Sequence, residues 1–291
     1  MHKKNAIFLR CVKCLGKINL EIFIERSEIC EGFIICSRCK EKYPIIDNVP
    51  IMMNSFVNYM QIRPSLGGKL ISLSKSKTMK EFIKNILSKI RKSNNDLSTI
   101  EERWMTIYQK NRNSNYYSQI IKKSSKLSNT KFVLEHGSSI GTISKLLTTK
   151  HENVFGLDTS YHAINVAKKE FQENVDFFVS DSLFHPFGKK KFDIVFALNM
   201  LELVEPIELL NTMFKQVKHG HIVISDPYDY DRGKNSVRKP LYEYDIRKNI
   251  RKLGMSIVYN TRTPSSLPWN LKINSRTSLN YMVDLIIAKK F

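Results

Sequence analysis

The sequence predicts a small β module followed by a larger α/β domain with a doubly wound, mostly parallel sheet. From about residue 130 onward, short apolar segments alternate with amphipathic ones, as in strands joined by crossover helices. All five cysteines lie within the first 39 of 291 residues, where apolar residues alternate as in β-strands. We therefore expect a β module at residues 1–54, a basic helical connector at 55–99 and the α/β domain at 100–291.

The β module carries two C-x2-C pairs, Cys11/Cys14 and Cys36/Cys39, with 21 residues between them. Four thiolates form the closed tetrahedral shell that structural zinc prefers, so the spacing predicts a zinc ribbon in which Cys30 is left over. Clustered cysteines favour a metal site in a reducing compartment over a secreted disulfide scaffold. We expect a cytoplasmic protein, also because the first residues contain no apolar stretch of the secretory-signal type.

A family resemblance accompanies these cysteines. After the second pair, residues 43–50 read YPIIDNVP, close to the ending Tyr-Pro-Ile-x-Asp-Gly-Ile-Pro. Residues 8–53 thereby resemble the zinc-ribbon family that includes the small activator subunit of tRNA, rRNA and release-factor methyltransferases. Asn48 replaces the usual glycine, and asparagine also tolerates a positive φ.

The connector is strongly basic. The chain carries a net charge of +20, and residues 61–125 hold 14 Lys+Arg against 4 Asp+Glu. This excess indicates either a polyanionic partner or AT-rich codon usage, since Lys outnumbers Arg 34 to 13. Residues 79–90 have the apolar spacing of an amphipathic helix, either a packing helix with a solvated face or a clamp for an anionic surface. No apolar run reaches the length of a membrane helix, so we expect no integral membrane association.

In the larger domain, the apolar segments predict parallel strands, and two later ones predict a strand pair. The strands are expected at residues 131–135, 153–158, 175–179, 192–199 and 221–225, and the pair at 254–259 and 281–288. Helices are expected at 142–149, 160–171 and 206–218. Trp269 falls in the segment between the last two strands, either as a lid over an acceptor or as part of the core.

Polar residues follow the predicted parallel strands where each one ends. Ligands of such sheets bind at the carboxyl ends of the strands, so Glu135, Asp158, Asp181 and Asn199 are candidate site residues. Glycines 137 and 141 would let the backbone approach a ligand at a helix N-terminus. A carboxylate at Asp158 could accept two ribose hydroxyls, whereas singly each aspartate is more typical of a cap or turn.

These features resemble the class I S-adenosylmethionine-dependent methyltransferases, of the type-11-like group, over residues 100–291. The first motif, Val-Leu-(Asp/Glu)-x-Gly-x-Gly-x-Gly, reads VLEHGSSIG at 133–141, with Ser139 in place of the middle glycine. The resemblance implies a Rossmann-like sheet with a C-terminal antiparallel strand pair. It also implies the following cofactor-binding residues: Glu135, Gly137, Ser139, Gly141, Asp158, Asp181, Ser182 and Asn199.

The acceptor is left open. The motif Asn/Asp-Pro-Pro-Tyr of amine methyltransferases is absent after the fourth strand. After the fifth strand, Ser225-Asp226-Pro227-Tyr228 is either an acceptor loop or an ordinary turn. No catalytic base is identified. The ribbon and the charge favour RNA or a ribosome- or translation-associated protein as acceptor. The alternatives are a small-metabolite methyltransferase and a non-catalytic zinc interaction protein. A nicotinamide dinucleotide is the competing cofactor, disfavoured by Glu135 and Asp181.

Overall fold

The computed structural model describes residues 1–91, 96–124, 127, 130–169, 172–233 and 237–291. They form two compact units. Unit 1 contains Met1–Thr106, Ser139–Gly141 and Leu157–Gly188, and unit 2 contains Ile107–Ser138, Thr142–Gly156 and Lys189–Phe291. The domain boundaries expected at residues 54/55 and 99/100 stay predictions. No helix in the described ranges is long and apolar enough to cross a membrane.

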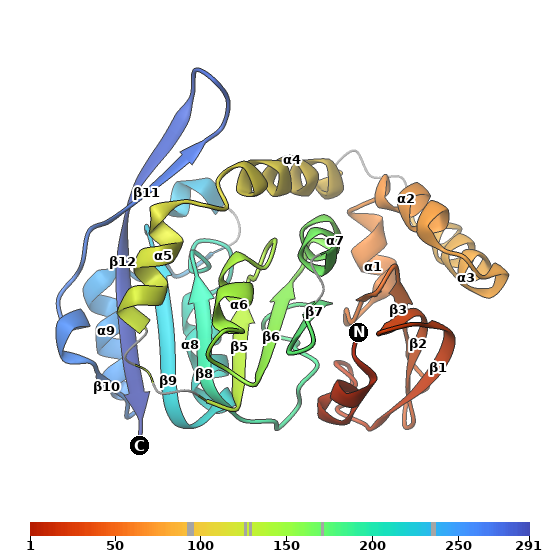
Figure 1. The fold of residues 1–291 in the computed structure, drawn as a ribbon, viewed down its shortest axis with the longest axis horizontal. Helices are drawn as coiled ribbons and strands as arrows, with labels where there is room; N and C mark the ends of the chain where they lie inside the picture. Colours follow the sequence, from red (N-terminus) through yellow and green to blue (C-terminus); the bar gives the residue numbers. More distant parts are fainter. Residues whose placement is uncertain (92–95, 125–126, 128–129, 170–171, 234–236) are drawn as a thin grey trace. The chain divides into compact units, whose positions relative to one another are not determined.

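Unit 1 begins with a small antiparallel sheet and continues with helices (Figure 1). Its elements are η1 (Lys3–Phe8), β1 (Ile18–Glu25), β2 (Ile29–Cys36), β3 (Lys42–Ile46), β4 (Val49–Pro50), α1 (Phe56–Gln61), α2 (Leu66–Leu73), α3 (Lys77–Leu87), α4 (Leu97–Lys110, as far as residue 106), α7 (Tyr161–Lys169) and β7 (Val175–Val179).

The small sheet follows the sequence order β1-β2-β3-β4, because each strand returns antiparallel beside its predecessor. Between β3 and β4 the chain turns at Asp47 and Asn48, with φ angles of 49° and 70°. Two successive positive φ angles belong to a tight hairpin turn, and Asn and Asp tolerate them better than other residues with a Cβ. Asn48 thus adopts the conformation that the sequence led us to expect.

The small sheet is tied to β7 through its last residues. Ile51 forms a parallel bridge with Val179, and the Met52 N–H donates to the Val179 carbonyl at 2.8 Å. The next residue of the β7 end, Ser180, donates its hydroxyl to the Met52 carbonyl at 3.1 Å. These bonds occupy an edge of β7 that would otherwise present unpaired backbone groups.

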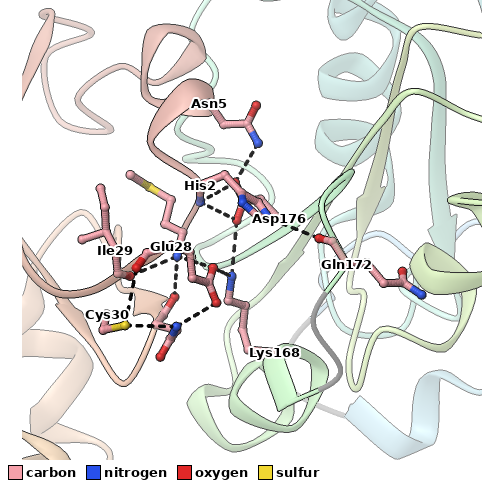
Figure 2. Close-up of polar contacts among 10 residues, drawn as sticks. His2, Asn5, Glu28, Ile29, Cys30, Lys168, Gln172 and Asp176 are labelled. Carbon is pink, nitrogen blue, oxygen red and sulfur yellow. Dashed lines mark hydrogen bonds and ion pairs between the residues drawn. The ribbon is translucent and has the colours of Figure 1, made fainter. Parts of the chain in front are cut away.

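A buried charge cluster makes a second connection inside unit 1, shown in Figure 2. The Lys168 ammonium pairs with the carboxylates of Glu28 and Asp176, and the Met1 amine lies 2.6 Å from Glu28. Asp176 also accepts the backbone N–H of His2. Burial lowers the pKa of the Met1 amine to about 6, with the nearby Lys168 charge adding to the effect. Buried charges persist only when they are paired, as they are here.

Helix α3 confirms the amphipathic pattern, although its bounds are Lys77–Leu87 rather than 79–90. Met79, Ile83 and Ile86 are buried, whereas Lys77 and Lys84 are exposed. The Ser76 hydroxyl accepts the Met79 N–H at 3.1 Å and so begins the helix as an N-cap. The structure therefore gives α3 a packed apolar face and a solvated basic one.

Unit 2 carries most of the larger sheet and the helices next to it in sequence (Figure 1). Its elements are α5 (Asn115–Ser124), β5 (Phe132–His136), α6 (Thr142–Leu147), β6 (Asn153–Asp158, as far as residue 156), β8 (Phe192–Leu198), α8 (Pro206–Gln216), β9 (Val217–Asp226), η2 (Tyr230–Gly233), α9 (Glu243–Lys252), β10 (Ser256–Ile257), η3 (Tyr259–Thr261), β11 (Leu267–Lys272) and β12 (Ser278–Lys290).

The larger sheet has the strand order β10-β12-β9-β8-β5-β6-β7, with β11 beside β12. β8 lies parallel to both β5 and β9, whereas β12 lies antiparallel to β9 and β10. The order reverses between β5 and β8, which is a topological switch point. This is the predicted doubly wound, Rossmann-like sheet with an antiparallel C-terminal end, and the fold class is confirmed.

Several predicted boundaries shift by one to four residues. The expected helix at 160–171 is α7, Tyr161–Lys169, and residues 170 and 171 lie outside the described part. The segment around Trp269 is not a loop but strand β11, whose burial alternates along its length. Trp269 is 1% exposed and packs beside Tyr116 and Tyr281, with ring centroids 5.3 and 5.4 Å away. It belongs to the core, and the lid alternative is wrong.

Candidate cofactor and metal sites

Four cysteine sulfurs meet at one end of the small sheet. The Sγ atoms of Cys11, Cys14, Cys36 and Cys39 all lie within 4.8 Å of one another. Cys11 and Cys14 come from the turn before β1, and Cys36 and Cys39 from the end of β2 and the turn after it. The two C-x2-C turns thus place four sulfur donors close enough together to hold one metal ion. Cys30 is not in the cluster, as expected.

The surroundings favour the thiolate at Cys36, whereas burial raises the pKa of the Cys11 thiol, and, despite a backbone bond to Glu41, burial and the neighbouring thiols raise that of Cys39. The Cys36 sulfur accepts the backbone N–H groups of Arg38 and Cys39, each at 3.4 Å. Burial acts to raise the pKa of the Cys36 thiol, but these donors and the neighbouring thiols outweigh it and lower the pKa to about 6. The Tyr43 hydroxyl lies 3.0 Å from the Cys11 sulfur. A thiol with this pKa is largely deprotonated at pH 7, and the thiolate is the form that binds a metal.

In unit 2, the first predicted motif residues follow β5 directly. Glu135 is 3% exposed, and its carboxylate accepts the Ser144 hydroxyl of α6 at 2.5 Å. Gly137 has a φ of 65°, and a Cβ there would lie 2.1 Å from the Met200 sulfur. Only glycine fits such a position, both because of its φ and because of the close neighbour. The buried Ser138 hydroxyl has no hydrogen-bond partner among the described residues.

In unit 1, Asp158 is held at the end of β6 by backbone groups from two segments. One carboxylate oxygen accepts the Ser139 N–H at 2.9 Å and the other accepts the Ser160 N–H at 2.8 Å. Ser139 takes a φ of 48°, so this serine adopts the left-handed conformation of the glycine it replaces. The structure brings Ser139 and Asp158 together, as a shared site requires.

The electrostatics of Asp158 come from residues that the sequence reasoning missed. Burial raises the pKa of Asp158, while the Ser160 and Ser139 N–H groups and the Arg63 guanidinium act to lower it. Arg63 lies just after α1 and pairs with Glu101 of α4, with an Nη2–Oε1 distance of 2.5 Å. No motif marks either residue, and a lone Arg in a basic stretch carries no signal of burial.

Gly141 has a structural role in unit 1. Its φ is 75°, and a Cβ would lie 2.6 Å from the Phe177 ring and 3.1 Å from the Ala167 Cβ. This is the packing of a loop against α7 and β7. The glycine is therefore required by its neighbours whether or not a ligand approaches it.

Asp181 and Ser182 follow β7 at the expected place. The Asp181 carboxylate accepts the Leu183 N–H at 2.7 Å, the geometry of an Asx turn, and Ser182 is 6% exposed. Just before them, the Ser180 N–H donates to the Asp158 carbonyl at 2.9 Å. Asp158 and the 180–182 turn thus lie on adjacent strand ends, and the second oxygen of Asp181 is left for another donor.

Asn199 lies at the end of β8 in unit 2 with a φ of 54°. Its N–H donates to the Ser225 carbonyl at 2.7 Å, and its side-chain oxygen accepts the Tyr116 hydroxyl at 3.2 Å. The Tyr116 hydroxyl also lies 2.5 Å from the Ser225 hydroxyl. Burial raises the pKa of Tyr116 above its usual range, so this tyrosine is neutral and donates hydrogen bonds.

The turn after β9 is also constrained. Asp226 is 1% exposed and accepts the N–H groups of Leu201 and Tyr228, both at 2.8 Å. Tyr228 has a φ of 56°, an uncommon conformation for an aromatic residue. Its hydroxyl donates to Asp284, which pairs with Arg247 at 2.6 Å. Strained residues that their surroundings hold in place occur preferentially at functional sites, so the 225–228 segment stays a candidate acceptor loop.

Residues 133–220 match a family model described as a methyltransferase domain. No curated protein matches the chain. The prediction that the larger domain is a methyltransferase is confirmed over residues 133–220.

Solved structures of similar fold include methyltransferases from three organisms. Magnesium protoporphyrin IX methyltransferase from Synechocystis is 17% identical, with a TM-score of 0.48, over 67% of this chain and 95% of that one. A putative methyltransferase from Bacillus halodurans is 13% identical, with a TM-score of 0.47, over 60% and 98%. A phosphoethanolamine N-methyltransferase from Haemonchus contortus is 20% identical, with a TM-score of 0.43, over 51% and 39%.

Proposed function

We propose that this chain, whose residues 133–220 match a methyltransferase domain, transfers methyl groups from S-adenosylmethionine to an RNA acceptor. The proposal assigns the cofactor's ribose to Asp158 and its adenine amine to Asp181. The loop of Gly137, Ser139 and Gly141 would approach the cofactor with its backbone. Glu135, Ser182 and Asn199 complete the proposed set of cofactor-binding residues.

The observation that carries the cofactor assignment is the state of Asp158. Each carboxylate oxygen already accepts one backbone N–H, from Ser139 or Ser160, which fixes the plane of the carboxylate. An oxygen that accepts one N–H keeps a second lone pair, so the carboxylate can accept one ribose hydroxyl on each oxygen. Nicotinamide cofactors use a similarly placed acid, and the methyltransferase match favours S-adenosylmethionine.

When bound, S-adenosylmethionine would supply a methyl group activated by its sulfonium, which passes to a nucleophile of the acceptor as S-adenosylhomocysteine leaves. The chain's own contribution is positioning. Asp158 orients the ribose, the Asp181 turn accepts the adenine amine, and the buried Ser138 hydroxyl offers a donor that no described residue uses. Asn199 and Tyr116 are neutral polar groups at the end of β8, suited to orient an acceptor rather than to remove a proton.

Zinc is part of the proposal. The four cysteines near one another at one end of the small sheet would hold a structural Zn²⁺, with no position left open for catalysis. A ribbon of this size buries too little apolar surface to fold without a metal. We therefore assign the metal to folding of the N-terminal sheet.

The RNA acceptor rests on charge and its placement. The apolar residues of α3 face inward, which leaves Lys77, Lys84 and nearby Lys89 exposed on unit 1. The net charge of +20 is favourable for a polyanion and unfavourable for small cationic acceptors. A ribosome- or translation-associated protein is the second acceptor class, supported by the ribbon's resemblance to the activator family.

Two experiments test these assignments. Calorimetric titration of S-adenosylhomocysteine into the zinc-loaded protein should show micromolar binding that D158A abolishes, while S182A, a smaller change beside Asp181, weakens it less. Absence of binding by the wild type would contradict the cofactor assignment. For the acceptor, transfer of labelled methyl from S-adenosylmethionine should be measured into total RNA, ribosomal protein and a metabolite extract.

The charge argument has its own readout. Binding of a labelled RNA should weaken steeply between 50 and 200 mM salt, and K84Q/K89Q should reduce the salt slope by about one to two. The control is S88A, a small change at an exposed residue between the two lysines that removes no charge and should leave the salt slope unchanged. Label found only in protein or in a metabolite, with no salt-dependent RNA binding, would overturn the RNA acceptor and leave the cofactor assignment intact.

A further inference from the structure

We infer that Arg63, clamped between Tyr59 and Glu101, is a positioning residue that supports the turn of Asp158 in the place where it would bind the cofactor's ribose. The inference rests on the proposed function, in which Asp158 accepts the ribose hydroxyls. It extends the site to α1 and α4, two helices outside residues 133–220.

Arg63 is a buried cation whose position is fixed by its neighbours. The Arg63 side chain is 4% exposed, and its Nε and Nη2 atoms donate to both oxygens of Glu101 at 2.5 to 3.1 Å. Its guanidinium carbon lies 4.2 Å from the centre of the Tyr59 ring. A forked pair to a carboxylate together with stacking on an aromatic ring leaves Arg63 no other position. Lysine could supply the charge but not this geometry.

The second step connects the clamp to the residue after Asp158. Tyr59 is 3% exposed, and its hydroxyl donates to the Thr159 carbonyl at 2.9 Å. Thr159 follows Asp158 directly and precedes Ser160, whose N–H binds the Asp158 carboxylate. One aromatic side chain therefore supports the Arg63 guanidinium with its ring and the turn of Asp158 with its hydroxyl.

The third step is electrostatic. Two charged groups are coupled electrostatically to Asp158: Arg63, just after α1, and Glu101 of α4, with the neutral Tyr59 beside Arg63. Burial raises the pKa of Asp158, while the Ser160 and Ser139 N–H groups and then the Arg63 guanidinium lower it. The Asp158 charge raises the pKa of Glu101, and because the repulsion between two carboxylates acts on both, Glu101 also opposes ionisation of Asp158. Removing Arg63 should therefore raise the pKa of Asp158, and removing Glu101 should lower it.

The experiment is the pH dependence of S-adenosylhomocysteine affinity in the full-length, zinc-loaded protein. Affinity in the wild type should fall as pH drops through the pKa of Asp158, because a protonated carboxyl accepts only one hydroxyl well. In R63Q this fall should begin at a higher pH, so that the affinity of R63Q relative to the wild type decreases as the pH is lowered. In E101Q the fall should begin at a lower pH than in the wild type.

Matched variants separate this role from a structural one. R103Q makes the same exchange at an exposed arginine of α4 and should leave the whole profile unchanged. Y59F keeps the ring under Arg63 but loses the bond to Thr159, so it should weaken binding by a similar factor at every pH. If R63Q leaves Glu101 unpaired and fails to fold, the double variant R63Q/E101Q removes both charges and should still weaken binding at low pH.

The outcomes are distinguishable. Wild-type affinity at all pH values in R63Q, or a loss equal at every pH, would overturn the role of Arg63. A D158N variant that binds as the wild type does would instead overturn the assignment of Asp158 in the proposed function. Opposite shifts in R63Q and E101Q, with R103Q unchanged, would establish α1 and α4 as part of the cofactor site.

Discussion

The main-chain N–H of Met52 donates a 2.8 Å hydrogen bond to the carbonyl of Val179, joining residues 127 positions apart. Met52 directly follows the small sheet with its cysteine cluster, and Val179 ends β7, two residues before Asp181. The Ser180 hydroxyl returns a second bond to the Met52 carbonyl. The small sheet is thereby attached to the turn that we assign to the adenine of the cofactor.

Loss of the metal should therefore weaken cofactor binding. C36S removes one of four ligands, so we expect loss of bound zinc, a melting temperature lower by several degrees and a weaker affinity for S-adenosylhomocysteine. C30S is the matched control, because Cys30 lies outside the cluster, and it should retain zinc, melting temperature and affinity. Unchanged affinity in a zinc-free C36S protein would show that ribbon and adenine turn are independent.

The two glycines Gly137 and Gly254 should respond differently to alanine. Both have a positive φ, of 65° and 79°, which costs an alanine about 1–2 kcal/mol. A Cβ at Gly254 meets nothing within 4 Å, whereas one at Gly137 would lie 2.1 Å from the Met200 sulfur. Urea unfolding should show G137A to be less stable than G254A by about a further 1–3 kcal/mol. Equal losses would mean that Met200 moves aside freely.

His136 should make stability fall in mild acid. Burial lowers its pKa to about 4, from an ordinary value of 6.5, although a bond to Gln216 opposes the shift. Between these two pH values the unfolded chain therefore binds one more proton than the folded protein. The contribution of His136 to the free energy of unfolding is fully present above pH 6.5 and is lost as the pH falls to about 4. The full loss is about 3 kcal/mol.

The check is urea unfolding at pH 7, 5.5 and 4.5 for the wild type and H136Q. The glutamine cannot titrate, so the variant should be less stable at pH 7 but should lose less on acidification. A parallel decrease in both proteins would assign the acid sensitivity to other groups.

A buried ion pair in unit 2 and an exposed one in unit 1 should contribute very differently to the free energy of unfolding. Arg247 and Asp284 are 1% and 3% exposed, and R247M leaves a buried carboxylate unpaired, so it should cost about 3–5 kcal/mol. Lys77 and Glu81 are 90% and 58% exposed on α3, and K77M should change stability by less than about 0.5 kcal/mol. A small effect of R247M in urea unfolding would mean that water reaches Asp284.

Local patterns were enough for much of the molecule. The two C-x2-C pairs predicted a sulfur cluster, and apolar alternation predicted β5 to β9, because both signals depend on residues close together in sequence. Ser139 and Asp158 were predicted from a motif and a strand end, and they do lie in hydrogen-bond contact. The sequence left Trp269 between a lid and the core, because its burial depends on β11 pairing with β12 and on contact with Tyr116, more than 150 residues earlier in the chain.

The sequence by itself therefore determined the fold class, the cysteine cluster and the positions of the polar residues at strand ends. Their cause is local, in strand and helix periodicity and in ligand spacing. Only the tertiary structure decided that Arg63 and Glu101 surround Asp158 and that Met52 joins β7. Those contacts join segments about 60 to 130 residues apart, where burial and charge are properties of the packed chain and leave no periodic mark in the sequence.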